Sequence, residues 1–81
     1  MGGNTLFTSD SRLKTDVVRV ASRSGFGIYE FTYRNDPMHH RYRGVMAQEI
    51  LQYRPDAVVL MDNGYYAVDY SKLDVVFEDI R

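Results

Sequence analysis

The chain contains no cysteine and is only 81 residues long, and these two facts leave few ways to stabilise a fold. Without cysteine, disulfides and thiolate metal sites are excluded. A structural zinc site also lacks ligands, because the only histidines are the adjacent pair His39 and His40. A core of this size supplies only about 3–5 kcal/mol of net stability. We therefore expect one domain that gains stability by associating with copies of itself, and that holds no metal or other cofactor.

The charge balance argues against two classes of partner. Ten basic and eleven acidic residues give a net charge of −1, so bulk electrostatics attracts neither nucleic acid nor an anionic membrane. No apolar run reaches the roughly 18 residues that a membrane span needs. The cluster Arg41, Tyr42 and Arg43 mixes basic and aromatic residues as single-strand binders do, but a solvated strand edge explains it more simply. We expect no nucleic-acid partner and no membrane contact.

An alternating pattern predicts a first β-hairpin. Three aromatic residues occupy every second position of the segment Ile28–Arg34, which is the pattern of a half-buried strand. The β-branched run Val17–Val20 precedes it, and the glycines of the segment Gly25–Gly27 indicate a turn between the two. The first ten residues of the chain, Met1–Asp10, are polar and unpatterned and are interpreted as an extended arm.

The middle of the chain predicts a short strand followed by a helix. The strand is expected over Arg43–Met46. In the segment Ala47–Arg54, apolar residues recur four apart, which places them on one side of a helix. Pro55 ends that helix, because its ring disfavours helical geometry for the residue before it.

A second hairpin is predicted further along. The continuous apolar run Ala57–Met61 fits a strand covered on both faces. Asn63–Gly64 favours a two-residue type I′ turn, and Tyr65–Tyr70 alternates as the partner strand.

The last segment, Ser71–Ile80, has the features of a second helix. Ser71 and Asp74 resemble a capping box, and the apolar residues form a helical stripe. The residues of that stripe are Leu73, Val76, Phe77 and Ile80. The predicted architecture is α+β: a small single domain of two β-hairpins with two short helices, assembled as a trimer.

The candidate chemistry lies between Thr8 and Lys14. A serine hydroxyl such as that of Ser9 is a weak nucleophile until a base removes its proton. A lysine such as Lys14 acts as that base if burial lowers its pKa, and Ser-Lys pairs are a known variant of serine catalysis. The spacing alone leaves the alternative open, because Ser9 and Asp10 are also ordinary turn and cap formers.

Three blocks of the sequence favour the catalytic interpretation. They are Ser9–Asp16, then Gly44–Glu49 followed by Arg54–Val58, and finally Asn63–Tyr65 with Val68–Leu73. Together and in this order, they resemble the intramolecular chaperone domains of phage tail spikes and fibres, which are also catalogued as S74 peptidases and include the endosialidase tail spikes. The similarity covers essentially the whole domain.

The resemblance implies a biological role. Members of this family lie at the C-terminus of a trimeric fibrous protein, aid its assembly and then cleave themselves from it. It implies an N-terminal arm at residues 1–8, comprising the end of the upstream fibre segment and a few added leader residues, and a chaperone domain at residues 9–81. The implied partners are two further copies and the upstream segment. The implied location is the virion tail, assembled in the host cytoplasm.

The resemblance also implies the site residues. The scissile bond is Thr8–Ser9, with Ser9 as the nucleophile that attacks the carbonyl of Thr8 and Lys14 as the base. We expect the arm to be too mobile for cleavage until docked subunits order it and dry the lysine. Gln48 is expected to make a polar contact near the Ser9 turn or with a neighbouring subunit. A structural cap that stays on the mature fibre is the alternative function, and a receptor-binding tip with tyrosine-rich faces is a more distant one.

Overall fold

The computed structural model describes residues 5–80, so the leader expected at the start of the chain lies outside this range. The described residues form two antiparallel sheets, of strand order β2-β3-β4-β7 and β1-β6-β5, together with an α-helix and short 3-10 turns. This bears out the predicted α+β class. The elements are β1 (Leu6–Thr8), β2 (Lys14–Arg23), β3 (Phe26–Tyr33), β4 (Arg41–Gly44), α1 (Ala47–Tyr53), β5 (Val58–Leu60), β6 (Tyr66–Asp69) and β7 (Glu78–Ile80).

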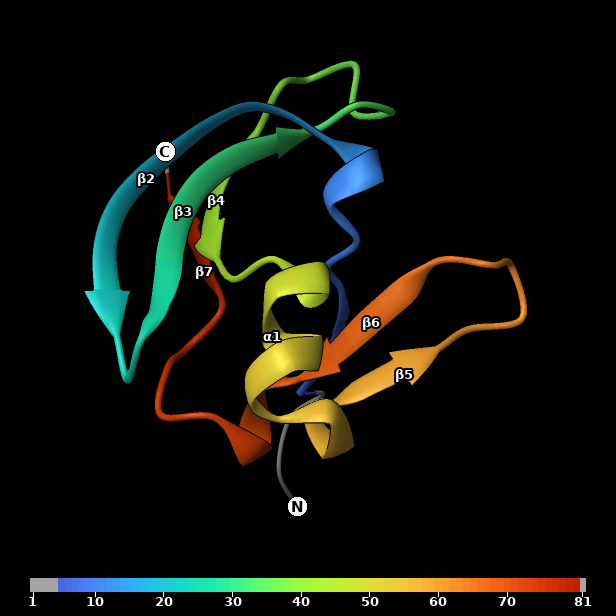
Figure 1. Cartoon of the computed structure of the whole chain (residues 1–81). Coiled ribbons are helices and arrows are strands. Elements are labelled where there is room, and N and C mark those ends of the chain that lie inside the picture. The colour runs from blue at the N-terminus through green and yellow to red at the C-terminus, as the bar shows by residue number, and fades with distance from the viewer. Residues whose placement is uncertain (1–4, 81) are drawn as a thin grey trace.

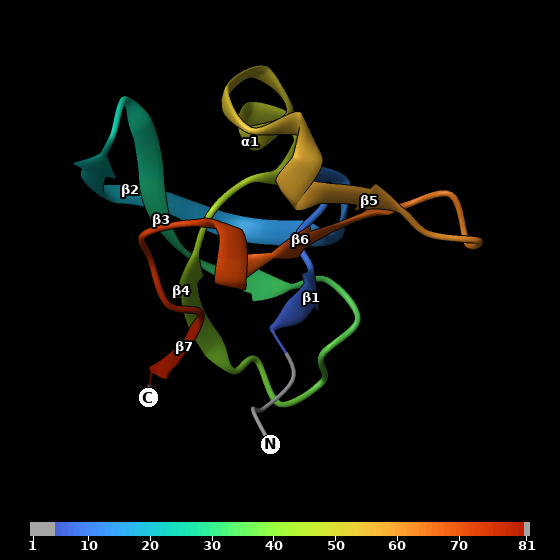
Figure 2. The same ribbon diagram turned by 90° about the horizontal axis from the view of Figure 1, so that it is seen from below.

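Helix α1 joins the two sheets. It contacts β3 of the larger sheet and both β5 and β6 of the smaller one. In Figure 1 it lies between the curved β2-β3 hairpin and the projecting β5-β6 hairpin. The view from below in Figure 2 shows α1 to one side of both sheets, with β1 and β6 passing beside the larger sheet.

The first predicted hairpin is present. Strands β2 and β3 pair in antiparallel register from Lys14–Tyr33 to Arg23–Phe26. The turn is tighter than expected and lies at Ser24–Gly25, where φ is 53° and 90°. Positive φ at both central residues is what a two-residue type I′ hairpin requires.

The second hairpin is also present, but two of its predicted details are wrong. The loop between β5 and β6 is five residues long, and Gly64 has a positive φ of 86° whereas Asn63 does not, so this is no two-residue type I′ turn. Strand β5 lies at an edge of its sheet and is also not covered on both faces, as the exposure of its side chains shows. Val59 and Leu60 are 41% and 63% exposed.

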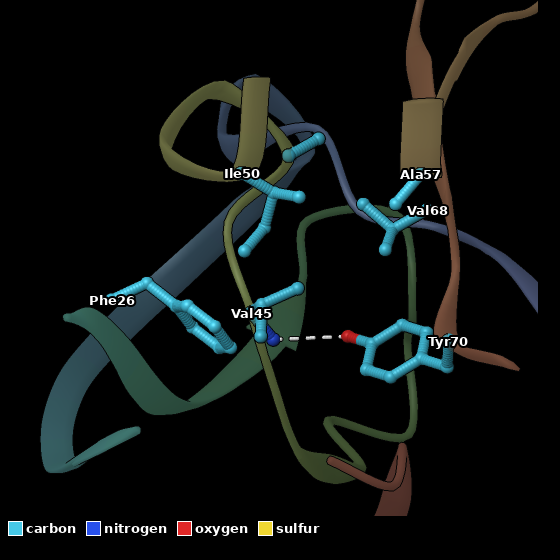
Figure 3. Close-up of a cluster of buried hydrophobic side chains, with 7 residues drawn as sticks. Phe26, Val45, Ile50, Ala57, Val68 and Tyr70 are labelled. Atoms are coloured by element: carbon cyan, nitrogen blue, oxygen red, sulfur yellow. Dashed lines mark hydrogen bonds between the residues drawn. The ribbon is translucent and has the colours of Figure 1, made fainter. Parts of the chain in front are cut away.

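Helix α1 confirms the prediction for the middle of the chain. It ends at Tyr53, and the N–H of the capping residue Arg54 donates to the carbonyl of Ile50. Ile50 points into the core, where Figure 3 shows it with Val45, Val68 and Tyr70. The segment that bears the basic and aromatic cluster is β4, which begins two residues earlier than predicted. It is an inner strand between β3 and β7 rather than a strand edge.

The predicted second helix at Ser71–Ile80 is wrong. After a 3-10 turn at Tyr70–Lys72, the chain is extended and ends in β7, which pairs with β4. Leu73, Val75 and Phe77 are partly buried, and the residue directly after each of them is exposed. This period of two matches a strand rather than a helix. The ring of Phe77 stacks on that of Tyr42, with a centroid distance of 5.4 Å.

The described part of the expected N-terminal arm, residues 5–10, includes a strand that is part of the fold. Residues Leu6–Thr8 form β1 and pair with β6. Ser9 and Asp10 follow directly and are completely buried. The residues around the expected cleavage point are therefore held by main-chain pairing within one chain.

Candidate functional site

A short turn brings Ser9 and Lys14 together. Ser9 follows the end of β1, and Lys14 is the first residue of β2. The 3-10 turn Ser11–Leu13 lies between them, and the carboxylate of Asp10 caps it by accepting the backbone N–H of Arg12. The exposed fractions of Ser9 and Lys14 are 0% and 2%. The two residues proposed from the sequence as nucleophile and base are thus adjacent and shielded from water.

The amine of Lys14 is surrounded by oxygen acceptors. Its Nζ lies 2.9 Å from Ser9 Oγ, 3.0 Å from the carbonyl oxygen of Ser9 and 2.7 Å from that of Val45. The ring centroid of Phe31 is 4.1 Å from Nζ. Burial lowers the pKa of Lys14 from 10.5 to about 7, against a smaller opposing effect from the charge of Asp10. Near neutral pH, a large share of the amine is therefore uncharged.

Both protonation states of Lys14 satisfy their hydrogen bonds in this arrangement. A charged ammonium has three donors, and Ser9 Oγ, Ser9 O and Val45 O accept them, while Ser9 Oγ donates to Val45 O at 2.5 Å. A neutral amine has two donors for the two carbonyl oxygens, and its lone pair then faces Ser9 Oγ. The same site can therefore hold the lysine as the acid or as the base partner of the serine.

The carboxylate of Asp10 stabilises the turn between Ser9 and Lys14, and its hydrogen-bond donors are other residues. It accepts hydrogen bonds from the side chain of Arg12, from Gln48 Nε2 at 2.7 Å and from the backbone N–H of Tyr66 at 3.0 Å. These donors, with Arg12 first, hold the pKa of Asp10 well below its usual range despite burial. Gln48 Oε1 also accepts the N–H of Ser11 at 2.8 Å. The expected polar contact between Gln48 and the Ser9 turn is confirmed.

The main chain of Ser9 is clamped on both sides. Its N–H donates to the carbonyl of Tyr66 at 3.0 Å, and its own carbonyl accepts the N–H of Ala47 at 2.9 Å. The segment that supplies the acceptor Val45 O is itself fixed, because Val45 N–H donates to the hydroxyl of Tyr70 at 2.9 Å (Figure 3). Tyr70 itself is buried, with 5% of its surface exposed.

Sequence reasoning missed the carbonyl of Val45, described above, and the phenol of Tyr33. Tyr33 Oη donates to the carbonyl oxygen of Thr8, at 2.5 Å. The only signal in the sequence was the alternation that placed Tyr33 on the same face as Phe31, whose ring covers the lysine. Thr8 and Tyr33 also border a surface pocket of about 510 Å³ with aromatic walls.

The histidine pair lies in a loop and does not contribute to this site. His40 Nδ1 lies 3.0 Å from Asp36 Oδ2 in the loop before β4. Within residues 5–80, no three histidine or acidic side chains are grouped so that they could hold a metal ion. The same residues contain no helix of sufficient length and apolar character to span a bilayer.

These observations define a small α+β domain with a buried serine–lysine contact beside a paired edge strand. A family model described as "Chaperone of endosialidase", of the peptidase S74 family, matches residues 9–59, and the chain belongs to this family. The match begins at Ser9 and confirms the suspected resemblance. The search of curated proteins and that of solved structures each returned no match.

Proposed function

We propose that this domain is the C-terminal intramolecular chaperone of a trimeric phage tail spike or fibre, and that it is released by cleavage of its own Thr8–Ser9 bond. Membership of the endosialidase chaperone family supports the assembly role. The observation that carries the cleavage proposal is the contact between Lys14 Nζ and Ser9 Oγ, both buried, with a lysine pKa of about 7. A neutral amine beside a serine hydroxyl is the arrangement that general-base activation requires.

The first step is an acyl shift within one residue pair. Lys14 Nζ accepts the Ser9 hydroxyl proton as Oγ forms a bond to the carbonyl carbon of Thr8. The bond from that carbon to the nitrogen of Ser9 then breaks, and Lys14 returns the proton to the leaving nitrogen. The product is an ester between Thr8 and Ser9 Oγ, with a free amine on Ser9.

The second step consumes one water. Water adds to the ester carbon, and one of its protons goes to the leaving Ser9 Oγ. The other passes from the new carboxyl group to the free amine of Ser9, which leaves a carboxylate on Thr8 and restores the serine. Because Ser9 and Lys14 are buried, water has little access from their side. Thr8 also lines the surface pocket that it shares with Tyr33, and we propose that water reaches the ester from this pocket.

Association as a homotrimer, with the upstream segment of the same polypeptide as a further partner, is part of the proposal. Apolar side chains are exposed on the edge strand β2, where Val17, Val18 and Val20 are 44%, 53% and 44% exposed. Contact between copies is the simplest way to cover them. The expectation that docking is needed to dry the lysine does not hold, because Lys14 is 2% exposed within one chain.

A non-cleaving cap that stays on the mature fibre is the second candidate. One observation favours it: the oxygens around Lys14 satisfy all three donors of a charged ammonium, as a purely structural lysine would need. The pairing of β1 with β6 would also keep a cut upstream segment attached to the domain.

Intact-mass measurement distinguishes the two candidates. A chain that carries the upstream fibre segment is expected to release a fragment beginning at Ser9, and the variants Ser9→Ala and Lys14→Met should remain full-length. The matched control is Ser11→Ala, an exposed serine two residues away, which should cleave like the unmodified chain. A full-length unmodified chain in assembled trimers would support the cap instead.

A further inference from the structure

The carbonyl oxygen of Thr8 faces away from the strand that pairs with β1. The carbonyl of Thr5 accepts the N–H of Tyr70 at 2.8 Å, and the N–H of Ser9 donates to Tyr66 at 3.0 Å. In an antiparallel pair only alternate residues exchange hydrogen bonds with the partner strand. Thr8 falls on the other set, so its carbonyl points outward from β6. Since β1 is an edge strand, this oxygen needs a partner from elsewhere.

That partner is the phenol of Tyr33. Its Oη donates to Thr8 O at 2.5 Å. Tyr33 ends β3, and it is the cross-strand partner of Lys14 in the β2-β3 register. Its ring packs against those of Phe31 and Tyr42, at centroid distances of 5.3 and 5.4 Å. The same pair of strands therefore positions the amine on the nucleophile and the phenol on the carbonyl.

The phenol is also held in its donating form. Burial raises the pKa of Tyr33 further above its ordinary value of 10. The group is therefore protonated at neutral pH, where the neutral form of Lys14 is substantially populated. Donor and base have the required protonation states at the same pH.

We propose that Tyr33 is a catalytic residue that stabilises the oxyanion formed on Thr8. This inference rests on the proposed self-cleavage. When Ser9 Oγ adds to the carbonyl carbon, the Thr8 oxygen gains negative charge, and a donor already aimed at it stabilises the transition state more than the ground state. Removing one such donor typically slows acyl transfer by a factor of about 100 or more.

The test compares cleavage rate constants in the chain that carries its upstream segment. Tyr33→Phe is expected to lower the first-order rate constant about 100-fold while leaving the assembled mass and the denaturation midpoint close to those of the unmodified chain. The matched control is Tyr42→Phe, which removes a phenol oxygen from the same aromatic cluster and should cleave at the unmodified rate. An unchanged rate in Tyr33→Phe overturns the inference.

A second measurement separates charge stabilisation from packing. Ring-fluorinated tyrosines at position 33 have nearly the same shape but a more acidic phenol, and the rate constant should increase with that acidity. If the rate does not depend on the acidity of the phenol and Tyr33→Phe is slow, the role of Tyr33 is structural and the inference is overturned.

The two proposals can fail separately. If cleavage requires Ser9 and Lys14 but is not slowed by Tyr33→Phe, only the inference about Tyr33 is overturned. If no cleavage depends on Ser9, both the proposed self-cleavage and the inference about Tyr33 are overturned.

Discussion

Burial of Lys14 favours the uncharged form of its amine. The side chain is 2% exposed, and its nearest partners are neutral oxygens and an aromatic ring. Removing an ammonium from water costs more than neutral acceptors return, so the neutral form is favoured. The negative charge of Asp10 raises the pKa of Lys14, but this effect is smaller than that of burial. The chemistry proposed for the site follows from this balance.

The cost of burying Lys14 predicts how stability depends on pH. The pKa is about 7 in the folded chain and 10.5 without the fold. Between these values the unfolded chain binds the extra proton, so the free energy of unfolding should increase with pH by up to about 1.4 kcal/mol per unit. Below the folded pKa the penalty for the buried charge is fully present. Denaturant titrations of Lys14→Met and its parent, both with Ser9→Ala to prevent cleavage, should differ in this slope. If the difference in the free energy of unfolding between the two proteins does not change with pH, the account is contradicted.

At the level of residues, the sequence located the dyad only through its motif. The separation of Ser9 and Lys14 says nothing about burial, and burial is what changes the pKa of the lysine. The acceptor Val45 and the donor Tyr33 come from distant parts of the chain, so no local pattern could place them. The polar contact of Gln48 was expected with the Ser9 turn or with a neighbouring subunit, and the structure shows it with the turn.

At the level of elements, one close approach ties the core to the site. A Cβ on Gly44 would collide with the hydroxyl of Tyr70 and lie 3.2 Å from a ring carbon of Phe77. That hydroxyl accepts the N–H of Val45, whose carbonyl accepts from Lys14. Space at Gly44 is therefore needed for the geometry of the lysine.

Gly44→Ala is predicted to disturb stability and cleavage together. Overpacking against the buried ring should lower the free energy of unfolding by about 2 kcal/mol, and displacement of the Val45 peptide should slow cleavage. Denaturant titration and mass spectrometry measure the two effects. The control is Val76→Ala, at a side chain that is 74% exposed, which should change stability by less than about 0.5 kcal/mol. A Gly44→Ala variant as stable as this control would contradict the packing argument.

Elements with one dominant period were predictable, and the last segment was not. Segments Ile28–Arg34 and Ala47–Arg54 each show a single pattern, and both formed the predicted element. Segment Ser71–Ile80 contains a helical stripe and, over Leu73–Phe77, an alternation that shares two of its residues. Pairing with β4 and the stacking of Phe77 on Phe7 and Tyr42 favour a strand over a helix in this segment. These contacts join segments that are distant in the sequence, so the local pattern of apolar residues could not predict them.

At the level of the whole molecule, the site is complete within one chain. The strand before the proposed scissile bond, the turn, the lysine and the helix that follows Val45 all belong to the same fold (Figure 1). Assembly is therefore not required to form the contact between Ser9 and Lys14.

This predicts how cleavage depends on concentration. The reaction of the chain with its upstream segment should be first order, with the same rate constant above and below the concentration at which trimers dissociate. Analytical ultracentrifugation establishes the association state, and mass spectrometry follows the fragment that begins at Ser9. A rate constant that falls as trimers dissociate would show that a neighbouring subunit completes the site.

The central claim is that an uncharged Lys14 activates Ser9, and the pH dependence of cleavage tests it most directly. Rate constants for the chain with its upstream segment, measured from about pH 5 to about pH 10, should rise roughly tenfold per unit and then level off above a pKa of about 7. The expected plateau reports complete deprotonation of the amine. A rate that keeps rising towards the ordinary lysine pKa of 10.5, or one that shows no pH dependence, would contradict the account.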